Sequence, residues 1–340
     1  MPPREGNKTQ TVRDFIRRYP HTPSKTLARM LVAEHPTLWR NIESCRSMIR
    51  VVRGNSGSEK QKAGRRDKTL FRPHGKQGVF ASLPPSIKYL DPFNAFLVDG
   101  PGVWLVIADL HCPFHDDAAL TVALEHGKNE GCTGVLINGD LVDFYQISDH
   151  KKDPTLVEFR EEVEACQQMI VALRQIFPKQ RMIWKWGNHE DRYQRWLWVK
   201  APELLGIPEF SFDAVFHLKE LKVEQVINKQ PIRLGKLWVV HGHEFRSGWS
   251  ADPVNPARNL FLRCHENAME GHVHRSSHHG ERLPLSNHMI SCFSTGCLCQ
   301  LAAPYNPLNR WNAGFAIVRI EKDGAFTVEN YRIVNGKAYT

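Results

Sequence analysis

Five short polar motifs follow one another along the chain, and each comes directly after an apolar run. They are Asp109-Leu110-His111, Gly139-Asp140-Leu141-Val142-Asp143, Gly187-Asn188-His189-Glu190, Val240-His241-Gly242-His243 and Gly271-His272-Val273-His274. Apolar runs of this length, such as 104–108 and 134–138, are typical of buried strands. Functional groups of α/β proteins collect at strand ends, where loops approach a ligand, so we expect the motifs to meet at one site.

The spacing of apolar residues between the motifs indicates the fold class. Helical periodicity is present over 118–126 and over roughly 156–177, and a further strand is predicted over 181–186. Short β segments then dominate, at 231–241, 267–271, 287–294, 314–320 and 325–333. A βαβ beginning followed by a β-rich end predicts an α/β sandwich of two sheets with helices outside.

The residue types of the motifs indicate metal chemistry. Histidine nitrogens and carboxylate oxygens suit Mn, Fe, Zn and similar divalent ions. The spacings D-x-H and H-x-H place alternate side chains on one side of an extended segment. An aspartate is short enough to bridge two metals about 3.5–4 Å apart, which can share a hydroxide and clamp a phosphoryl group. Glycine in motifs two, three and five lets the backbone turn sharply.

The complete series of motifs resembles that of the calcineurin-like metallophosphoesterase superfamily, over about residues 100 to 335. The resemblance implies a four-layer α/β/β/α sandwich with two divalent metal ions at the sheet ends. Manganese is favoured, with Fe, Zn, Ni or Co as alternatives. One metal would be held by Asp109, His111 and His274. The other would be held by Asn188, His241 and His272, with Asp140 bridging.

The resemblance also implies roles for two residues that hold no metal. His189 would act at the leaving oxygen as general acid or as an electrostatic stabiliser, and Asp143 would orient its imidazole. In the fourth motif either histidine could be the ligand. His241 is favoured over His243 because it directly follows the strand predicted over 237–240. Arg192 and Arg195 could clamp a phosphate, but a solvated helix face is favoured for both. Cys297 and Cys299 are expected on one face of a strand rather than as metal ligands.

The basic charge of the protein lies in its first quarter. Residues 1–78 hold 18 Lys and Arg against 6 Asp and Glu, a net charge of +12, whereas the whole chain carries +9. Three short helices are predicted over 9–53, with Thr11, Ser24 and Asn41 as their N-caps. The third would carry Arg46, Arg50 and Arg53 on one face. The module resembles a helix-turn-helix, or alternatively is a small solvated bundle.

These features divide the chain into three parts. A basic helical module is expected over 1–54, a flexible basic linker and lead-in over 55–94, and the metallophosphoesterase domain over 95–340. The linker adds Arg65 and Arg66 as candidate phosphate contacts, beside those of the module. A segment this basic favours a nucleic-acid partner, bound through residues 1–78. No protein partner is indicated.

The preferred function is a nucleic-acid-directed phosphodiesterase or nuclease, with DNA as the expected substrate. One alternative is a phosphomonoesterase or cyclic-nucleotide phosphodiesterase acting on a small substrate, and another is a catalytically idle nucleic-acid-binding protein. Phe144 follows Asp143 where protein Ser/Thr phosphatases of the superfamily have Arg-Gly, which argues against that branch. Scattered cysteines, a polar N-terminus and no apolar run of 18 residues predict a cytoplasmic protein without a membrane partner.

Overall fold

The computed structural model describes residues 5–19, 22–53, 94–150, 152–245, 254–303 and 306–340. The chain forms two compact units, Met1–Leu90 and Asp91–Thr340. Most of the expected linker, including Arg65 and Arg66, lies outside the described residues.

The first unit contains three helices around a small apolar core. They are α1 (Glu5–Arg18), α2 (Ser24–Glu34) and α3 (Ile42–Val52). Val12, Phe15, Leu31 and Ile49 are among its fully or nearly buried residues. The expectation of N-terminal helices is therefore confirmed.

Only one of the three predicted helix caps of this unit is confirmed. Asn41 accepts a hydrogen bond from the backbone N–H of Ser44 at the start of α3. Thr11 lies inside α1, because that helix begins at Glu5, before its apolar periodicity starts. Ser24 is the first residue of α2, and the preceding Pro23 makes no side-chain cap.

The three arginines of α3 differ in their surroundings. Arg50 is exposed, whereas Arg46 is half-buried and pairs with Glu43 at 3.2 Å. The Arg53 guanidinium donates to the backbone carbonyl of Thr22 at 2.8 Å and to the Ser24 hydroxyl at 3.1 Å. Arg53 therefore fastens the end of α3 to the start of α2, and nucleic-acid binding by this face stays a prediction.

A seven-stranded sheet forms one half of the second unit. Its strands, in spatial order, are β13 (Lys337–Tyr339), β12 (Phe326–Val334), β11 (Gly314–Ile320), β2 (Gly102–Ile107), β3 (Gly134–Asn138), β4 (Arg181–Lys185) and β5 (Val223–Val226). The run from β2 to β5 is parallel, and β11 joins β2 antiparallel. The carboxyl ends of these parallel strands therefore point to one edge, as the positions of the motifs predicted.

A six-stranded mixed sheet forms the other half. Its order is β1 (Phe96–Val98), β6 (Ile232–Leu234), β7 (Leu237–Val239), β8 (Ala268–Glu270), β10 (Met289–Ser294) and β9 (Ser277–Arg282). The single segment expected over 231–241 is in fact the hairpin of β6 and β7, which turns at Gly235 with φ of +60°. β9 was not predicted, because its sequence Ser-His-His-Gly-Glu-Arg has no apolar alternation.

Alternation along the strands explains how the layers stack. Leu105 and Ile107 of β2 pack under the helices, while Trp104 and Val106 face the second sheet. On β3, Val135 likewise packs under the helices and Leu136 faces the second sheet.

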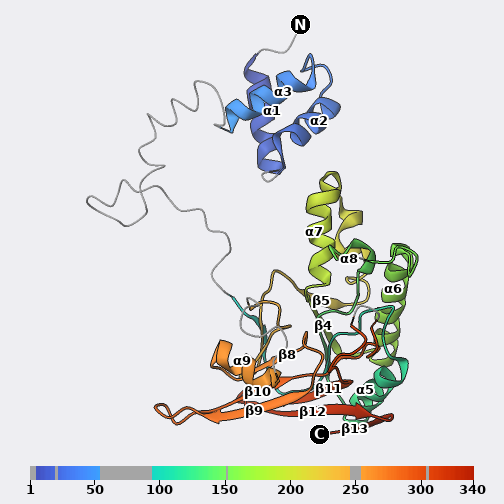
Figure 1. Cartoon of the computed structure of the whole chain (residues 1–340). Helices are drawn as coiled ribbons and strands as arrows, with labels where there is room; N and C mark the ends of the chain where they lie inside the picture. Colours follow the sequence, from blue (N-terminus) through green and yellow to red (C-terminus); the bar gives the residue numbers. More distant parts are fainter. Residues whose placement is uncertain (1–4, 20–21, 54–93, 151, 246–253, 304–305) are drawn as a thin grey trace. The chain divides into compact units, whose positions relative to one another are not determined.

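The helices complete the two outer layers. On the side of the seven-stranded sheet lie α5 (Asp117–Asn129), α6 (Phe159–Ile176), α7 (Glu190–Lys200), α8 (Phe212–Val215) and the short turns η2 (Tyr145–Ile147), η3 (Pro202–Leu204) and η4 (Pro208–Phe210). Helix α9 (Pro256–Cys264) packs on the outer face of the other sheet (Figure 1). The four-layer α/β/β/α sandwich is therefore confirmed.

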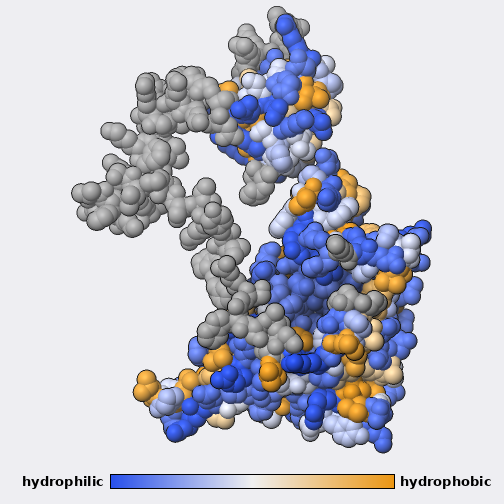
Figure 2. Space-filling view, viewed as in Figure 1, coloured by the Kyte–Doolittle hydropathy of each residue, from blue (hydrophilic) through white to orange (hydrophobic). Residues whose placement is uncertain are grey.

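The visible face of the second unit is mostly hydrophilic, with hydrophobic residues in small separate patches (Figure 2). Among the described residues, no helix has the length and apolar character needed to cross a bilayer.

Gly134 offers a test of the packing between the sheets. It lies opposite Trp104 in the register of β2 and β3, and a Cβ built on it would come 2.5 Å from the indole. We expect Gly134→Ala to lower the free energy of unfolding by about 1–3 kcal/mol, measured by urea denaturation, because the buried indole must move. Gly280→Ala is the control, since its nearest neighbour is the flexible end of Met289. An unchanged midpoint for Gly134→Ala would contradict this packing.

Candidate metal centre

The five motifs meet where their strands end. Motifs one to three directly follow β2, β3 and β4 of one sheet, and motifs four and five follow β7 and β8 of the other. The site therefore lies where the two sheets end side by side. Most of its side chains are buried, although Asn188 is half-buried and His272 is exposed.

Close contacts between nitrogen and oxygen atoms join the two sides of the site. His274 Nε2 lies 3.2 Å from Asp109 Oδ1, and His111 Nε2 lies 3.2 Å from His274 Nε2. On the other side, His241 Nε2 lies 3.2 Å from both Asp140 Oδ2 and Asn188 Oδ1. Asp140 lies between the two sides, because the same Oδ2 is 3.9 Å from His111 Nε2.

Of the two remaining histidines in motifs four and five, His272 lies in the cluster and His243 lies outside it. His272 offers a ligand atom within 4.8 Å of those of Asp140 and His241. His243, the alternative to His241, points elsewhere, with Nε2 3.3 Å from Asp191 Oδ2. The structure thus brings together all seven residues that were predicted to hold metal, and it leaves His243 outside their cluster.

The backbone of these residues is left-handed. Asp109, His111, Asp140, His272 and His274 have φ between +50° and +64°, a region that side-chain-bearing residues rarely adopt. The expectation that the D-x-H and H-x-H segments are extended is therefore wrong. Backbone strain of this kind clusters at functional sites, where the surrounding structure holds it in place.

The glycines of the motifs serve mainly to make room. Gly139 has φ of +89°, but Gly187 has no such conformation, so a sharp turn does not explain it. A Cβ on Gly187 would come 2.2 Å from Asp140 Oδ1, and one on Gly139 would come 2.2 Å from His241 Nδ1. The second and third motifs need glycine because the site side chains pack directly against their backbone.

Charge is concentrated in the cluster. Burial would raise the pKa of Asp140, but neighbouring His189 and His241 hold it well below its usual range. Burial would lower the pKa of His241, but Asp140 and Asp109 raise it to about 10. The facing Nε2 atoms of His111 and His274 need a proton or a cation between them. This donor set of oxygens and imidazoles therefore fits divalent metal ions.

His189 and Asp143 lie beside the cluster in contact with each other. His189 Nδ1 is 2.7 Å from the Asp143 carbonyl oxygen and 3.1 Å from Asp143 Oδ1. The same Oδ1 is 2.8 Å from His111 Nδ1. Asp143 therefore orients two imidazoles, whereas the sequence suggested only one.

Arg192 belongs to the site, contrary to the expectation of a solvated face. It is half-buried and donates to the Asp143 carbonyl at 2.8 Å. Its other guanidinium nitrogen lies 3.0 Å from His189 Nε2. Arg195, one turn further along α7, is exposed as expected. The signal that separates them is the spacing from His189, because residues three apart share one helix face.

Buried carboxylates hold the backbone of the motifs. Glu190 accepts hydrogen bonds from the backbone N–H groups of Asp140, Leu141 and Gly187 at 2.7–3.0 Å. It also accepts one from the Trp184 indole at 3.2 Å. Burial, together with the charge of Asp140, raises its pKa to about 7. The sequence showed Glu190 only as the last letter of a motif, and its role depends on contacts across the fold.

A second buried carboxylate acts in the fourth motif. Glu244 accepts from the backbone N–H groups of His241 and Gly242, and its Oε1 lies 2.6 Å from the Lys185 ammonium. Burial would raise the pKa of Glu244, but Lys185 and His243 lower it to about 2. Lys185 is fully buried at the end of β4, so this ion pair joins the two sheets beside the cluster.

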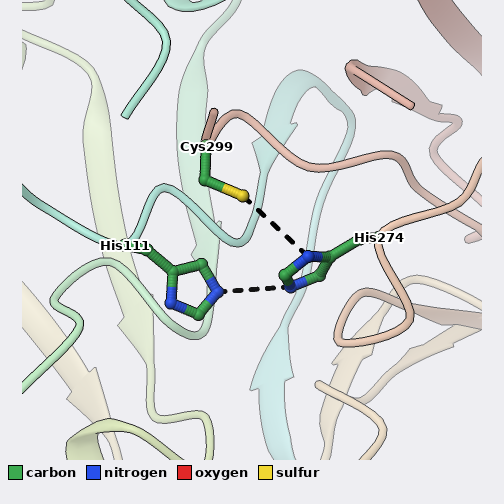
Figure 3. Close-up of side chains that lie close together, drawn as sticks. All are labelled: His111, His274 and Cys299. Atoms are coloured by element: carbon green, nitrogen blue, oxygen red, sulfur yellow. Dashed lines mark hydrogen bonds between the residues drawn. The ribbon is translucent and has the colours of Figure 1, made fainter. Parts of the chain in front are cut away.

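Cys299 was also missed as a site residue. Its Sγ lies 3.9 Å from His274 Nδ1, on the other side of the ring from His111 (Figure 3). His111, His274 and Cys299 offer ligand atoms within 4.8 Å of one another. Neither Cys297 nor Cys299 lies in a strand as expected, since each forms only an isolated bridge. The sequence signal for this position was the C-x-C pair itself, which lies shortly after β10 of the six-stranded sheet.

Residues 104–306 match the family model of the calcineurin-like phosphoesterases. Comparison with curated proteins finds no match.

Similar solved structures include a single mutant of Vps29 from Entamoeba histolytica, at 14% identity and a TM-score of 0.36, covering 70% of this chain and 96% of that one. Vacuolar Protein Sorting 29 from Cryptosporidium parvum has 13% identity and a TM-score of 0.38, covering 71% and 96%. Yfce, a phosphoesterase from E. coli, has 14% identity and a TM-score of 0.34, covering 67% and 98%.

Replacing Glu190 tests whether its carboxylate holds the site. In Glu190→Gln, the amide NH₂ would face two of the N–H donors in either orientation: the Asp140 and Gly187 amides, or the Leu141 amide and the Trp184 indole. We expect the free energy of unfolding to fall by about 2–3 kcal/mol, measured by denaturation, because buried donors lose their acceptor.

Glu164→Gln is the matched control, since Glu164 is exposed and pairs with exposed Arg160 on the surface of α6. It should change the stability by less than about 0.5 kcal/mol. Equal stability of the Glu190 and Glu164 variants would show that the carboxylate does not hold the motifs.

Proposed function

Because the chain belongs to the calcineurin-like phosphoesterase family, we propose that it is a phosphoester hydrolase that uses two divalent metal ions. The observation that supports this most directly is the convergence of seven nitrogen- and oxygen-bearing side chains from five separate segments. Asp140 lies between the two sides of that cluster, where a bridging ligand is needed.

The proposed ligand sets follow the two sides of the cluster. Asp109, His111 and His274 would hold one ion. Asn188, His241 and His272 would hold the other, with Asp140 shared by both. Manganese is the preferred ion in this proposal, and Cys299 beside His274 would favour a more thiophilic ion such as zinc or iron. When bound, the two ions would supply Lewis acidity and activate water for attack on phosphorus.

His189, Asp143 and Arg192 would serve the leaving oxygen. Asp143 fixes the His189 ring by accepting its Nδ1–H, so Nε2 faces outward from the contact. His189 would act as general acid once Nε2 carries a proton, and this requires Arg192 to move off that nitrogen, because a guanidinium only donates. The Arg192 guanidinium, 3.0 Å from that nitrogen, would stabilise the negative charge that develops in the same place.

The proposed substrate is a nucleic acid, with DNA preferred. The supporting observation is the net charge of +12 on residues 1–78, against −3 on the remaining 262 residues. Positive charge attached to a catalytic unit raises the local concentration of a polyanionic substrate. A small phosphomonoester or cyclic nucleotide is the second candidate. It is favoured by a pocket of about 640 Å³ beside His189 and Arg192, which has the size of a small-molecule site.

The two histidines of the fourth motif provide a test of the metal proposal. We expect His241→Ala to lower the affinity for the second metal ion at least about 100-fold and to abolish Mn²⁺-dependent hydrolysis of bis(4-nitrophenyl) phosphate. His243→Ala should retain metal, because its imidazole points to Asp191. Metal content measured by mass spectrometry, with titration calorimetry, would separate the variants.

Two outcomes would contradict the metal proposal. Loss of metal from the His243 variant alone would reverse the ligand assignment. Wild-type protein that neither binds nor responds to any divalent ion would favour the catalytically idle alternative.

Removal of the basic segment tests the choice of substrate. A chain beginning at residue 79 should cleave DNA oligonucleotides with a kcat/KM lower by about tenfold or more at low salt, since phosphate contacts are lost. Its rate on bis(4-nitrophenyl) phosphate should equal that of the full chain, because that substrate needs no distant contact. Equal DNA cleavage by both chains would remove the nucleic-acid proposal and leave the hydrolase proposal standing.

A further inference from the structure

A pocket opens directly beside the metal centre. His111, Asp143 and His189 form part of its wall, so a group bound there would lie next to a phosphoester at the metal centre. Its volume of about 640 Å³ lies within the roughly 300–1,000 Å³ that small-molecule sites occupy. The question is which chemical group the remaining wall would accept.

Three aromatic side chains line this pocket. They are Phe114 after the first motif, Tyr145 after the second and Trp311 before β11. The Phe114 and Tyr145 rings meet edge to face at 6.1 Å between centroids, and Trp311 lies against the His274 ring at 4.3 Å. All three are half-buried, and each contributes to the pocket wall.

The Tyr145 ring is held in place before any ligand arrives. Its backbone N–H donates to Glu162 Oε1 at 2.5 Å, and its hydroxyl accepts from the Asp153 N–H at 2.7 Å. Glu162 is fully buried in α6 and accepts from the Gln146 N–H as well. A wall that is already ordered loses little conformational entropy when it binds a ligand.

The rest of the wall combines aliphatic side chains, from Leu156, Ala302 and Ala303, with polar and cationic groups. The Lys152 ammonium is held at the pocket by the backbone carbonyls of Gln146 and Ser148. Arg192 lines the pocket next to His189, and the exposed Gln300 lines it as well. A ligand with a flat aromatic ring, polar ring edges and a phosphate matches this combination better than an alkyl chain does.

We propose that the pocket is a subsite for one unstacked nucleobase, carried by the nucleotide whose phosphoester lies at the metal centre. This inference rests on the proposed hydrolase function and specifies its substrate. A base that is paired and stacked in a duplex cannot enter such a pocket, whereas a base in a single strand or at a frayed end can. The chain would therefore act on single-stranded or end nucleotides.

Three phosphate monoesters whose leaving groups are primary alcohols test this subsite, because the pocket borders His189 and Arg192, which would serve the leaving oxygen. They are methyl phosphate, octyl phosphate and thymidine 5′-monophosphate, assayed by released phosphate with the full chain and Mn²⁺. We expect kcat/KM for the thymidine ester to exceed that of the other two by about tenfold or more, through KM, because base stacking on aromatic rings is worth this much. Equal values for the methyl and thymidine esters would overturn the subsite, and so would a preference for the octyl ester.

Variants show whether the aromatic wall gives the preference. Tyr145→Leu should lower the ratio of thymidine to methyl kcat/KM by about tenfold, and Trp311→Leu should act in the same direction. Tyr145→Phe keeps the ring and should keep the ratio. Tyr339→Leu is the matched control, since Tyr339 is an exposed residue of β13. A ratio unchanged in both leucine variants of the pocket would contradict the inference.

Binding measurements separate the subsite from the hydrolase proposal. Wild-type protein should bind thymidine monophosphate about tenfold or more tightly than inorganic phosphate in titration calorimetry, and Tyr145→Leu should remove the difference. If no ester is hydrolysed but this preference is found, the hydrolase proposal fails and the subsite stands. If thymidine monophosphate binds no better than phosphate, the subsite fails whatever the esters show.

Discussion

The candidate site depends on buried carboxylates that hold the backbone at the strand ends. Glu190 binds the amides of the second and third motifs, Glu244 binds those of the fourth, and Asp109 accepts from the His272 N–H of the fifth. A side-chain-bearing residue in the left-handed region costs on the order of 1–3 kcal/mol, and five such residues lie here. Charge-assisted hydrogen bonds inside the protein are strong enough to offset that strain. The same carboxylates thus hold the backbone from which the side chains of Asp140, His241 and His272 project.

Dense packing around these carboxylates leaves the site little freedom. Gly139 lies against the His241 side chain and Gly187 against that of Asp140, so neither position has room for a Cβ. The buried pair of Lys185 and Glu244 adds a contact from one sheet to the other. Breaking such a pair leaves an uncompensated buried charge, which is strongly unfavourable. The two sheets are consequently held at one relative position at the edge where the motifs meet.

The parts of this arrangement that are local in sequence were predictable. Strands β2, β3 and β4 and helices α5 and α6 follow from apolar runs and periodicity, and the motifs follow from their positions at strand ends. The parts that depend on tertiary contacts were not predictable. Strand β9 is polar, and Arg192 is recognised only once α7 places it over His189. The left-handed Asp140 and His272 donate their backbone N–H groups to carboxylates that are distant in sequence. Residue identity indicated what the site contains, but only the fold shows how each group is held.

The distribution of charge argues for a division of tasks between the two units in the proposed function. Residues 79–340 carry 27 Lys and Arg against 30 Asp and Glu, so this part of the chain does not attract a polyanion through its net charge. Its positive groups at the pocket, Arg192 and Lys152, act only over short distances, because salt screens exposed charges beyond about 10 Å. Long-range attraction would then fall to residues 1–78, and selection of the reacting nucleotide to the pocket. Salt should weaken the first far more than the second, since ring stacking involves no counterion release.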